Sequence, residues 1–277
     1  MPPRQVASPV VSSPPPEHVR VAFGVVAATP VQLTGGRGRT WRCGDVVLKP
    51  IEDAAEASWL AGTMEQLRVD GIRVARPVRS SDGRWVVAGW TAQRFVSGRP
   101  GSRYDDIVKA GDALHRAMSA VQRPRLLDRR ADLYSWSDRL AWGEITDDGR
   151  LGDGHGARLY ADIADGRRPV AAAAQLVHGD LFGNVLFAGS APPAVIDITP
   201  YWRPTSWATA VVVVDAVTWG GADTVLLTQY SDLPDWSQVL RRAVMFRLAV
   251  SLAHPRTTPE SLVEMLAAAE VIRPLLD

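Results

Sequence analysis

Residues 176–200 contain two short apolar segments, and the polar side chains around them have a spacing that suits catalysis. They are His178, Asp180, Asn184 and Asp197. A loop between two strands can direct the side chains of Asp180, Asn184 and Asp197 into one cleft. Phosphoryl transfer needs a carboxylate to orient the attacking hydroxyl and oxygen ligands to hold magnesium against the phosphates. Asp180 suits the first role, whereas Asn184 and Asp197 suit the second.

The His-Gly-Asp sequence that ends at Asp180, with Asn184 four residues later, resembles the catalytic loop of the aminoglycoside phosphotransferase family. That family is similar to the protein kinases, and its metal-binding Ile-Asp pair is matched at Asp197. The resemblance implies that Asp180 is the catalytic base and that His178 braces the loop. It also implies that Asn184 and Asp197 bind magnesium. ATP is the implied phosphoryl donor, with GTP left open, and a hydroxyl group of a small molecule is the implied acceptor.

The N-terminal part of the chain agrees with this resemblance in order and spacing. Three glycines lie in an expected hairpin, where the family covers the ATP phosphates: Gly35, Gly36 and Gly38. Lys49 ends the next expected strand, where the family has a lysine that contacts the phosphates. Glu56 resembles the helix glutamate that pairs with this lysine, and Glu52 is an alternative partner. The glycine segment departs from Gly-x-Gly-x-x-Gly, which leaves the nucleotide preference open.

The helices and strands that must position these residues can be predicted from apolar periodicity and from the glycines and prolines that mark turns. Residues 1–16 are rich in proline, and we expect them to form a disordered tail. Residues 17–97 are predicted to form a nucleotide-binding lobe, and residues 98–277 a mainly helical catalytic lobe, with a hinge near residues 96–99. The predicted fold class is α+β, a two-lobed arrangement that resembles the protein kinases. Its first lobe holds a five-stranded antiparallel sheet and one helix.

The pattern assigns a range to each element. In the first lobe, five strands are expected: one at residues 31–34, two within residues 40–49 separated by a turn at Gly44 and Asp45, and one each at residues 74–78 and 85–95. Helices are expected there at residues 17–23 and 51–68. In the second lobe, helices are expected at residues 104–121, 133–142 and 157–163, and strands at residues 185–187 and 194–196. Residues 206–276 are expected to be mostly helical. Within them, Asp215 has two expected roles: the resemblance implies an Asp that steadies the catalytic loop, and the alternative is a cap of a buried helix.

Composition narrows the classes of partner. Hydrophobic residues make up 46% of the 277-residue chain and charged residues 22%, which is ordinary for a globular protein. The formal net charge of +1 gives no electrostatic case for a nucleic-acid partner. No apolar run approaches the ~20 residues that cross a bilayer, and the N-terminus lacks the pattern of a signal peptide. The single cysteine, Cys43, fits a reducing compartment. We therefore expect a cytoplasmic protein without a membrane partner.

Alternative interpretations have weaker support. A Walker A loop needs a lysine after its glycines, and the segment before Thr40 lacks one. The scattered histidines do not have the spacing of a zinc site. A protein kinase would need a longer segment between Asp197 and Asp215 for peptide docking. The main alternative is a catalytically silent kinase-like protein that binds a nucleotide or serves as a scaffold, although the set of polar residues is complete.

The acceptor is not named by the sequence, and two features suggest different molecules. Carboxylates that would favour a cationic aminoglycoside are Asp132, Asp138, Glu144, Asp147 and Asp148. Two aromatic side chains, Trp202 and Trp219, would instead stack on an aromatic ring or a sugar. Both possibilities remain open at this point.

Overall fold

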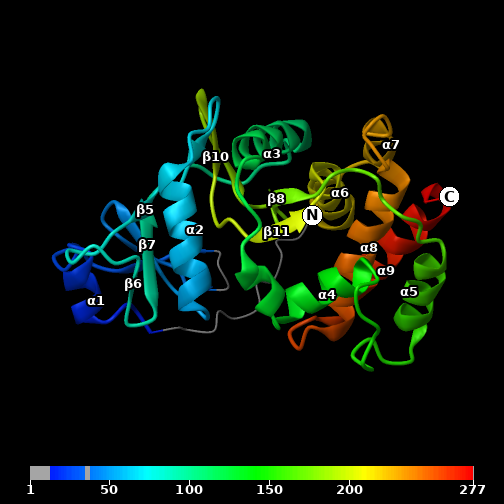
Figure 1. Ribbon diagram of the computed structural model, residues 1–277, viewed down its shortest axis with the longest axis horizontal. Coiled ribbons are helices and arrows are strands. Elements are labelled where there is room, and N and C mark those ends of the chain that lie inside the picture. The colour runs from blue at the N-terminus through cyan, green and yellow to red at the C-terminus, as the bar shows by residue number, and fades with distance from the viewer. Residues whose placement is uncertain (1–12, 35–37, 277) are drawn as a thin grey trace. The chain divides into compact units, whose positions relative to one another are not determined.

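The chain divides into two compact units in the computed structural model, which describes residues 13–34 and 38–276 (Figure 1). The first unit holds the described residues up to Arg99 together with Phe187–Asp197. The second holds Pro100–Leu186 and the described residues from Ile198 onward. The greater part of the expected tail, residues 1–12, lies outside the described residues, and so do Gly35 and Gly36.

The first unit is built on an antiparallel sheet. Its strands are β1 (Val31–Gln32), β2 (Trp41–Cys43), β3 (Val46–Pro50), β5 (Pro77–Val78), β6 (Val86–Val87) and β7 (Trp90–Arg94). The order is β1-β2-β3-β7-β5, and β6 also pairs with β7. This six-stranded sheet has one strand more than expected, because residues 85–95 fold back on themselves. Ala88 and Gly89 have φ angles of 48° and 77°, which is the conformation of a tight hairpin turn.

Two helices accompany this sheet. Helix α1 (Glu17–Ala22) corresponds to the short helix expected at residues 17–23, and it buries Val19 against Cys43 and Leu48. Helix α2 (Ala54–Gln66) begins after Asp53, whose Oδ1 accepts hydrogen bonds from the N–H groups of Ala55 and Glu56 at 2.7 and 2.9 Å. This side-chain cap satisfies two of the four free N–H groups at the helix start.

A second, three-stranded sheet has the order β4-β10-β9, with β4 at Arg73–Val74, β10 at Ala191–Val195 and β9 at Val185–Ala188. The expected strand at residues 74–78 is therefore two strands in different sheets. The break falls at Arg76, which precedes a proline, and a residue in that position is restricted in its backbone conformation. The Arg76 guanidinium donates to the carbonyl oxygens of Met64 and Leu67, at 2.8 and 2.6 Å.

The second unit is mainly helical. Its helices are α3 (Tyr104–Met118), α4 (Leu133–Ala141), α5 (His155–Asp165), α6 (Thr205–Asp215), α7 (Leu226–Gln229), α8 (Trp236–Ala253) and α9 (Pro259–Ile272). Helix α6 is apolar on all sides, and such a helix must be buried. Figure 1 shows α8 running among α4, α6 and α9, and α6 and α8 meet through Trp207 and Phe246, whose ring centroids are 5.7 Å apart. Both side chains are at most 1% exposed.

A two-stranded ribbon of the second unit leads into the loop that carries the polar motif. Strand β8 (Gln175–His178) pairs antiparallel with β11 (Pro200–Arg203), and Pro200 lies opposite His178. Strand β11 was not expected, because proline cannot donate to a sheet ladder and marks an edge position. The mixed α+β architecture predicted from the sequence is confirmed, with a sheet-rich N-terminal part and a helical C-terminal part. No helix in the described part of the chain is long and apolar enough to cross a membrane.

Two valines that differ in burial test where the stability of the second unit arises. Val213 in α6 is 0% exposed, whereas Val225 is 69% exposed. Val213→Ala removes two buried methyl groups and leaves a cavity, so the free energy of unfolding should fall by roughly 2 kcal/mol or more. Val225→Ala should change it by less than about 0.5 kcal/mol. Urea unfolding measures both variants, and equal effects would contradict this assignment of the core.

Candidate active site

The predicted site residues divide between the two units. The first unit contains Lys49, Glu56, Asp197 and the described glycine Gly38, and the second contains His178, Asp180 and Asn184. Gly35 and Gly36 belong to the residues that the structure does not describe. Gly38 has a φ angle of 70°, which favours glycine, and its carbonyl oxygen accepts a hydrogen bond from Gln32 Nε2 at 2.6 Å.

Lys49 and Asp197 form an ion pair in the first unit. The Nζ atom of Lys49, at the end of β3, contacts Oδ1 of Asp197, which follows β10. Asp197 has a φ angle of 52°, in the left-handed region that costs a residue with a side chain on the order of 1–2 kcal/mol. Such strain persists where surrounding contacts hold it, and it concentrates at functional sites. A cation and a carboxylate in contact form a pair that can face a phosphate and its metal ion.

The two candidate partners of Lys49 occupy different places. Glu56 lies in the first turn of α2 and is half-buried. Glu52 precedes the helix, is exposed, and pairs with Arg39 at 3.2 Å. Lys49 forms its ion pair with Asp197, and its pairing with Glu56 stays a prediction.

In the second unit, His178 connects the catalytic loop to the residues around it. Its imidazole Nδ1 accepts hydrogen bonds from the N–H groups of Asp180 and Thr199, at 3.2 and 3.3 Å. The backbone N–H of His178 donates to Nε2 of His115 at 3.1 Å. Burial, with a smaller contribution from the neighbouring His178, lowers the pKa of His115 to about 3, so His115 is neutral and can accept this bond. His178 thus holds both ends of the segment from Asp180 to Thr199.

The glycine between His178 and Asp180 is required by packing. A Cβ atom built on Gly179 would lie 2.3 Å from Cδ2 of Tyr201, a buried ring on β11. The N–H of Gly179 also donates to the Thr199 carbonyl oxygen at 3.1 Å. Any larger residue would displace either the loop or the Tyr201 ring.

Asn184 contacts Asp180 directly. Its Nδ2 donates to the carbonyl oxygen of Asp180 at 2.7 Å and approaches Oδ2 of the same residue at 3.3 Å. With Nδ2 engaged in this way, the amide oxygen is the atom of Asn184 that remains to bind a cation. Amide and carboxylate oxygens, such as those of Asn184 and, in the first unit, Asp197, are each of the ligand type that magnesium prefers. The donor chemistry therefore fits magnesium.

Asp180 has a further partner that the sequence did not suggest. Nη2 of Arg247, in α8, donates to Oδ1 of Asp180 at 2.7 Å. The same guanidinium donates to Asp215 through Nε at 2.7 Å and Nη2 at 2.5 Å. Asp215, the last residue of α6, makes no capping hydrogen bond. Of the two expected roles for Asp215, a connection to the catalytic loop is therefore the one its contacts support, and the connection runs through Arg247.

Burial and charge act together on this group. The side chains of Arg247 and Asp215 are 8% and 2% exposed, whereas that of Asp180 is 42% exposed. The pKa of Asp215 is raised to about 6, because burial outweighs the opposing effect of Arg247 and the Asp180 charge adds a smaller rise. Burial by itself lowers the pKa of Arg247, but Asp215 and Asp180 outweigh it and raise that pKa above its ordinary value.

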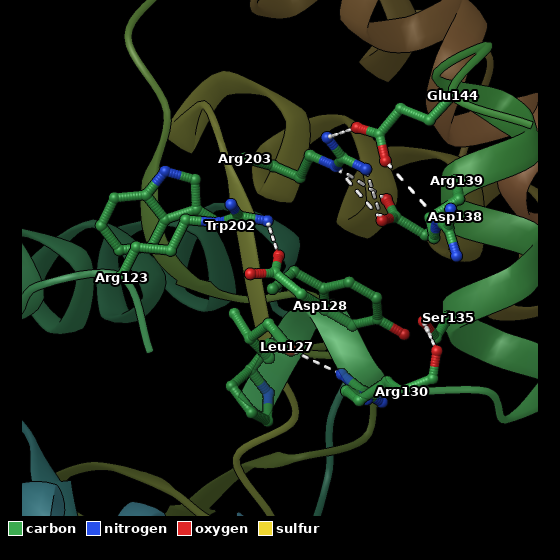
Figure 2. Close-up of a pocket in the computed structure, with 12 residues that line it drawn as sticks. Arg123, Leu127, Asp128, Arg130, Ser135, Asp138, Arg139, Glu144, Trp202 and Arg203 are labelled. Atoms are coloured by element: carbon green, nitrogen blue, oxygen red, sulfur yellow. Dashed lines mark hydrogen bonds and ion pairs between the residues drawn. The ribbon is translucent and has the colours of Figure 1, made fainter. Parts of the chain in front are cut away.

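The second unit also contains a cavity of about 210 Å³ between β11, α4 and the 3₁₀ turn Arg125–Arg129 (Figure 2). Trp202 and Arg203 of β11 line it, as does Tyr201, the ring that packs against Gly179. The cavity is therefore next to the catalytic loop, separated from it by the Tyr201 side chain. Trp219, the other expected stacking residue, lies in the π-helical turn Ala216–Gly220 and is not one of the lining residues.

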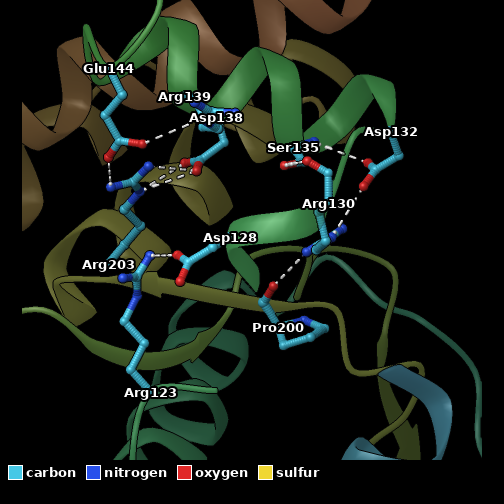
Figure 3. A network of polar contacts seen from close by, with 10 residues as sticks. All are labelled: Arg123, Asp128, Arg130, Asp132, Ser135, Asp138, Arg139, Glu144, Pro200 and Arg203. Carbon is cyan, nitrogen blue, oxygen red and sulfur yellow. Dashed lines mark hydrogen bonds and ion pairs between the residues drawn. The ribbon is translucent and has the colours of Figure 1, made fainter. Parts of the chain in front are cut away.

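The carboxylates of this region are paired with arginines (Figure 3). Arg203 binds Asp138 at 2.7 and 3.0 Å and Glu144 at 2.6 Å, and Arg123 binds Asp128 at 2.6 Å. Burial raises the pKa of Asp138, and the Arg203 charge opposes this rise.

The remaining expected carboxylates are engaged too. Asp132 caps α4 through the N–H of Ser135 and pairs with Arg130 at 3.1 Å. Asp147 accepts from the N–H groups of Arg150 and Leu151 at 3.1 and 3.4 Å, and Asp148 pairs with Arg150 at 3.2 Å. The five carboxylates singled out in the sequence therefore do not form an uncompensated acidic patch.

The raised pKa of Asp215 predicts a component of stability that depends on pH. Because its pKa in the folded protein is about 6 against an ordinary value of 3.8, its contribution is full below the ordinary value and is lost as the pH rises through about 6. The free energy of unfolding of the wild type, relative to Asp215→Asn, should thus fall between these pH values by roughly 3 kcal/mol at most. Urea unfolding at several pH values measures this difference. A difference that rises with pH would contradict the stated direction.

The fold and the family can be identified by comparison with known proteins. Residues 31–199 match the family described as the phosphotransferase enzyme family, APH. No curated protein sequence matches the chain. Among solved structures, spectinomycin phosphotransferase APH(9)-Ia in complex with ADP and spectinomycin is 14% identical, with a TM-score of 0.58 over 92% of this chain and 95% of that one.

Two further structures have a similar fold. The amicoumacin kinase hAmiN, in complex with AMP-PNP, Ca²⁺ and Ami, is 13% identical, with a TM-score of 0.57 over 89% of this chain and 88% of that one. A thermostable mutant of aminoglycoside phosphotransferase APH(4)-Ia, in complex with ADP and hygromycin B, is 12% identical, with a TM-score of 0.58 over 93% and 97%. These likenesses show the kinase-like fold, and the match over residues 31–199, more than half of the chain, shows that it belongs to the phosphotransferase enzyme family.

Proposed function

We propose that this phosphotransferase moves the γ-phosphate of ATP, bound with magnesium, to a hydroxyl group of a small molecule. The observation that carries the proposal is the state of the Asp180 carboxylate. It is 42% exposed, yet Oδ1 is held by Arg247 at 2.7 Å and Oδ2 lies 3.3 Å from Asn184. An accessible carboxylate in a fixed orientation is what a base needs to accept the proton of a hydroxyl.

The chemical step follows from these roles. Asp180 accepts the hydroxyl proton while the acceptor oxygen forms a bond to the γ-phosphorus, and the bond from that phosphorus to the bridging oxygen of ADP breaks. Lys49 contacts the phosphates that are not transferred, as the cation at the end of β3. Asn184 and Asp197 supply oxygen ligands to magnesium, which neutralises charge on the phosphates when it is bound. GTP is the alternative donor.

The cavity beside β11 supports a proposal about the acceptor. Tyr201, which lines the cavity, also packs against Gly179 of the catalytic loop. Trp202 offers an aromatic face to a bound ring. Because the carboxylates are paired with arginines, a polycation would have to break those pairs and would also meet Arg130 and Arg139. We therefore expect an acceptor with a hydroxylated ring and little positive charge.

Nucleotide binding and turnover test the catalytic assignment separately. By calorimetry, wild type should bind ATP more tightly with magnesium than without it, and Asp197→Ala should lose that difference because a metal ligand is missing. Asp180→Ala should keep binding but lose about 100-fold or more of the turnover, since general-base catalysis contributes on this order. Exposed Asp232→Ala is the matched control. Full turnover by Asp180→Ala would refute its role as base, and binding without any turnover by wild type would favour the catalytically silent alternative.

The charge balance of the cavity gives a further test, with kanamycin as a polycationic probe. Wild type should bind kanamycin with a Kd of roughly 1 mM or weaker, because the cavity offers no uncompensated carboxylate. Arg139→Glu reverses a lining charge beside Glu144 and should strengthen binding by about tenfold. Arg158→Glu, an exposed residue of α5, makes the same change in net charge and should have no such effect. Micromolar binding to wild type would contradict the proposed acceptor class.

A further inference from the structure

Arg247 is a buried cation that reaches an accessible carboxylate. Its side chain is 8% exposed, and it contacts Asp180, whose side chain is 42% exposed. It belongs to α8, and 67 positions separate it from Asp180 in the sequence. A guanidinium has its donors in a fixed planar arrangement, so the position of one nitrogen determines the direction of the others.

Asp215 fixes that arrangement from the opposite side. Its two carboxylate oxygens accept from Nε and Nη2 of Arg247, at 2.7 and 2.5 Å. This two-point contact restrains rotation of the guanidinium. Helices α6 and α8, which carry the pair, also pack through the buried rings of Trp207 and Phe246. The direction of Nη2 toward Asp180 is therefore set by the helical core and not by the loop.

We propose that Arg247 is a positioning residue for the phosphoryl-transfer step, and this inference rests on the proposed function. By holding Oδ1 of Asp180, it stops the carboxylate from rotating and leaves Oδ2 to receive the acceptor proton. Oδ2 has the weaker contact, with Asn184 Nδ2 at 3.3 Å.

Asp215 has a second effect, on charge. Arg247, Asp215 and Asp180 together carry a formal charge of −1, so the guanidinium does not cancel the negative charge that a base needs. If Asp215 lost its charge, Arg247 would act on Asp180 alone and would draw its electron density away from the acceptor proton. Asp215 thus makes it possible for Asp180 to be held by a cation and still accept a proton.

Turnover of MgATP with water as the acceptor tests this role without knowledge of the natural acceptor. Arg247→Met should lower kcat by about 100-fold, as expected when a catalytic group is misplaced, while KM for ATP changes by less than about twofold. Arg247→Lys should recover part of the loss, because an ammonium can reach one carboxylate but not hold both. Asp215→Asn should lower kcat without changing KM.

Arg242→Met is the matched control. Arg242 lies on the same helix and is 5% exposed, but its guanidinium donates to Gln238 and to the Arg168 carbonyl oxygen. The Arg242→Met substitution removes a buried guanidinium of α8 but leaves the contacts of Asp180 unchanged, so kcat should stay within about twofold of wild type. If folded Arg247→Met kept the same kcat as Arg242→Met, the positioning role would be wrong.

A double-mutant cycle separates this inference from the proposed function. The effect of Asp180→Ala on the free energy of unfolding should differ between the wild-type and Arg247→Met backgrounds, because the two residues interact. Additive effects would overturn the inference even if ATP is hydrolysed. If the effects were coupled but wild type bound no MgATP, the proposed function would fail while the link between Arg247 and Asp180 stood.

Discussion

The ion pair between Asp215 and Arg247 joins α6 to α8 at the centre of the second unit. Neither charge could be buried alone, because an isolated ion loses several kcal/mol of hydration in a protein interior. Their mutual contact offsets that cost and leaves one nitrogen of the guanidinium with a defined direction. Asp180 depends on this nitrogen, and the loop around it depends on His178, which binds the N–H groups of Asp180 and Thr199. The carboxylate of Asp180 is thus held in position by the core of the second unit.

The parts of the site that the sequence revealed are those with local spacing. Asp180 and Asn184 are four residues apart, and in the structure they contact each other. Lys49 could be located because a strand of apolar residues leads to it, although its contact with Asp197 was not foreseen. The mixed α+β fold was predictable because apolar periodicity changes between the first hundred or so residues and the rest.

The features that could not be predicted depend on contacts between residues far apart in the sequence, or on residues of a type that usually argues against the structure they adopt. Arg247 is one of several arginines in α8, and nothing in its neighbours distinguishes it from Arg242, since only tertiary packing brings it to Asp180. Strand β11 was missed because it begins at Pro200, a residue that usually argues against a strand. The turn at Ala88 divides an expected strand, because a non-glycine residue rarely adopts positive φ.

The packing of Tyr201 against Gly179 limits how the proposed acceptor cavity can change. The Tyr201 ring fills the space that a side chain at residue 179 would occupy, and Tyr201 also lines the cavity. A smaller residue at position 201 would enlarge the cavity but would remove the support of the catalytic loop. New acceptors are therefore more accessible to evolution, or to an engineer, through Trp202 and the pair of Arg123 and Asp128, on parts of the wall that do not carry the loop.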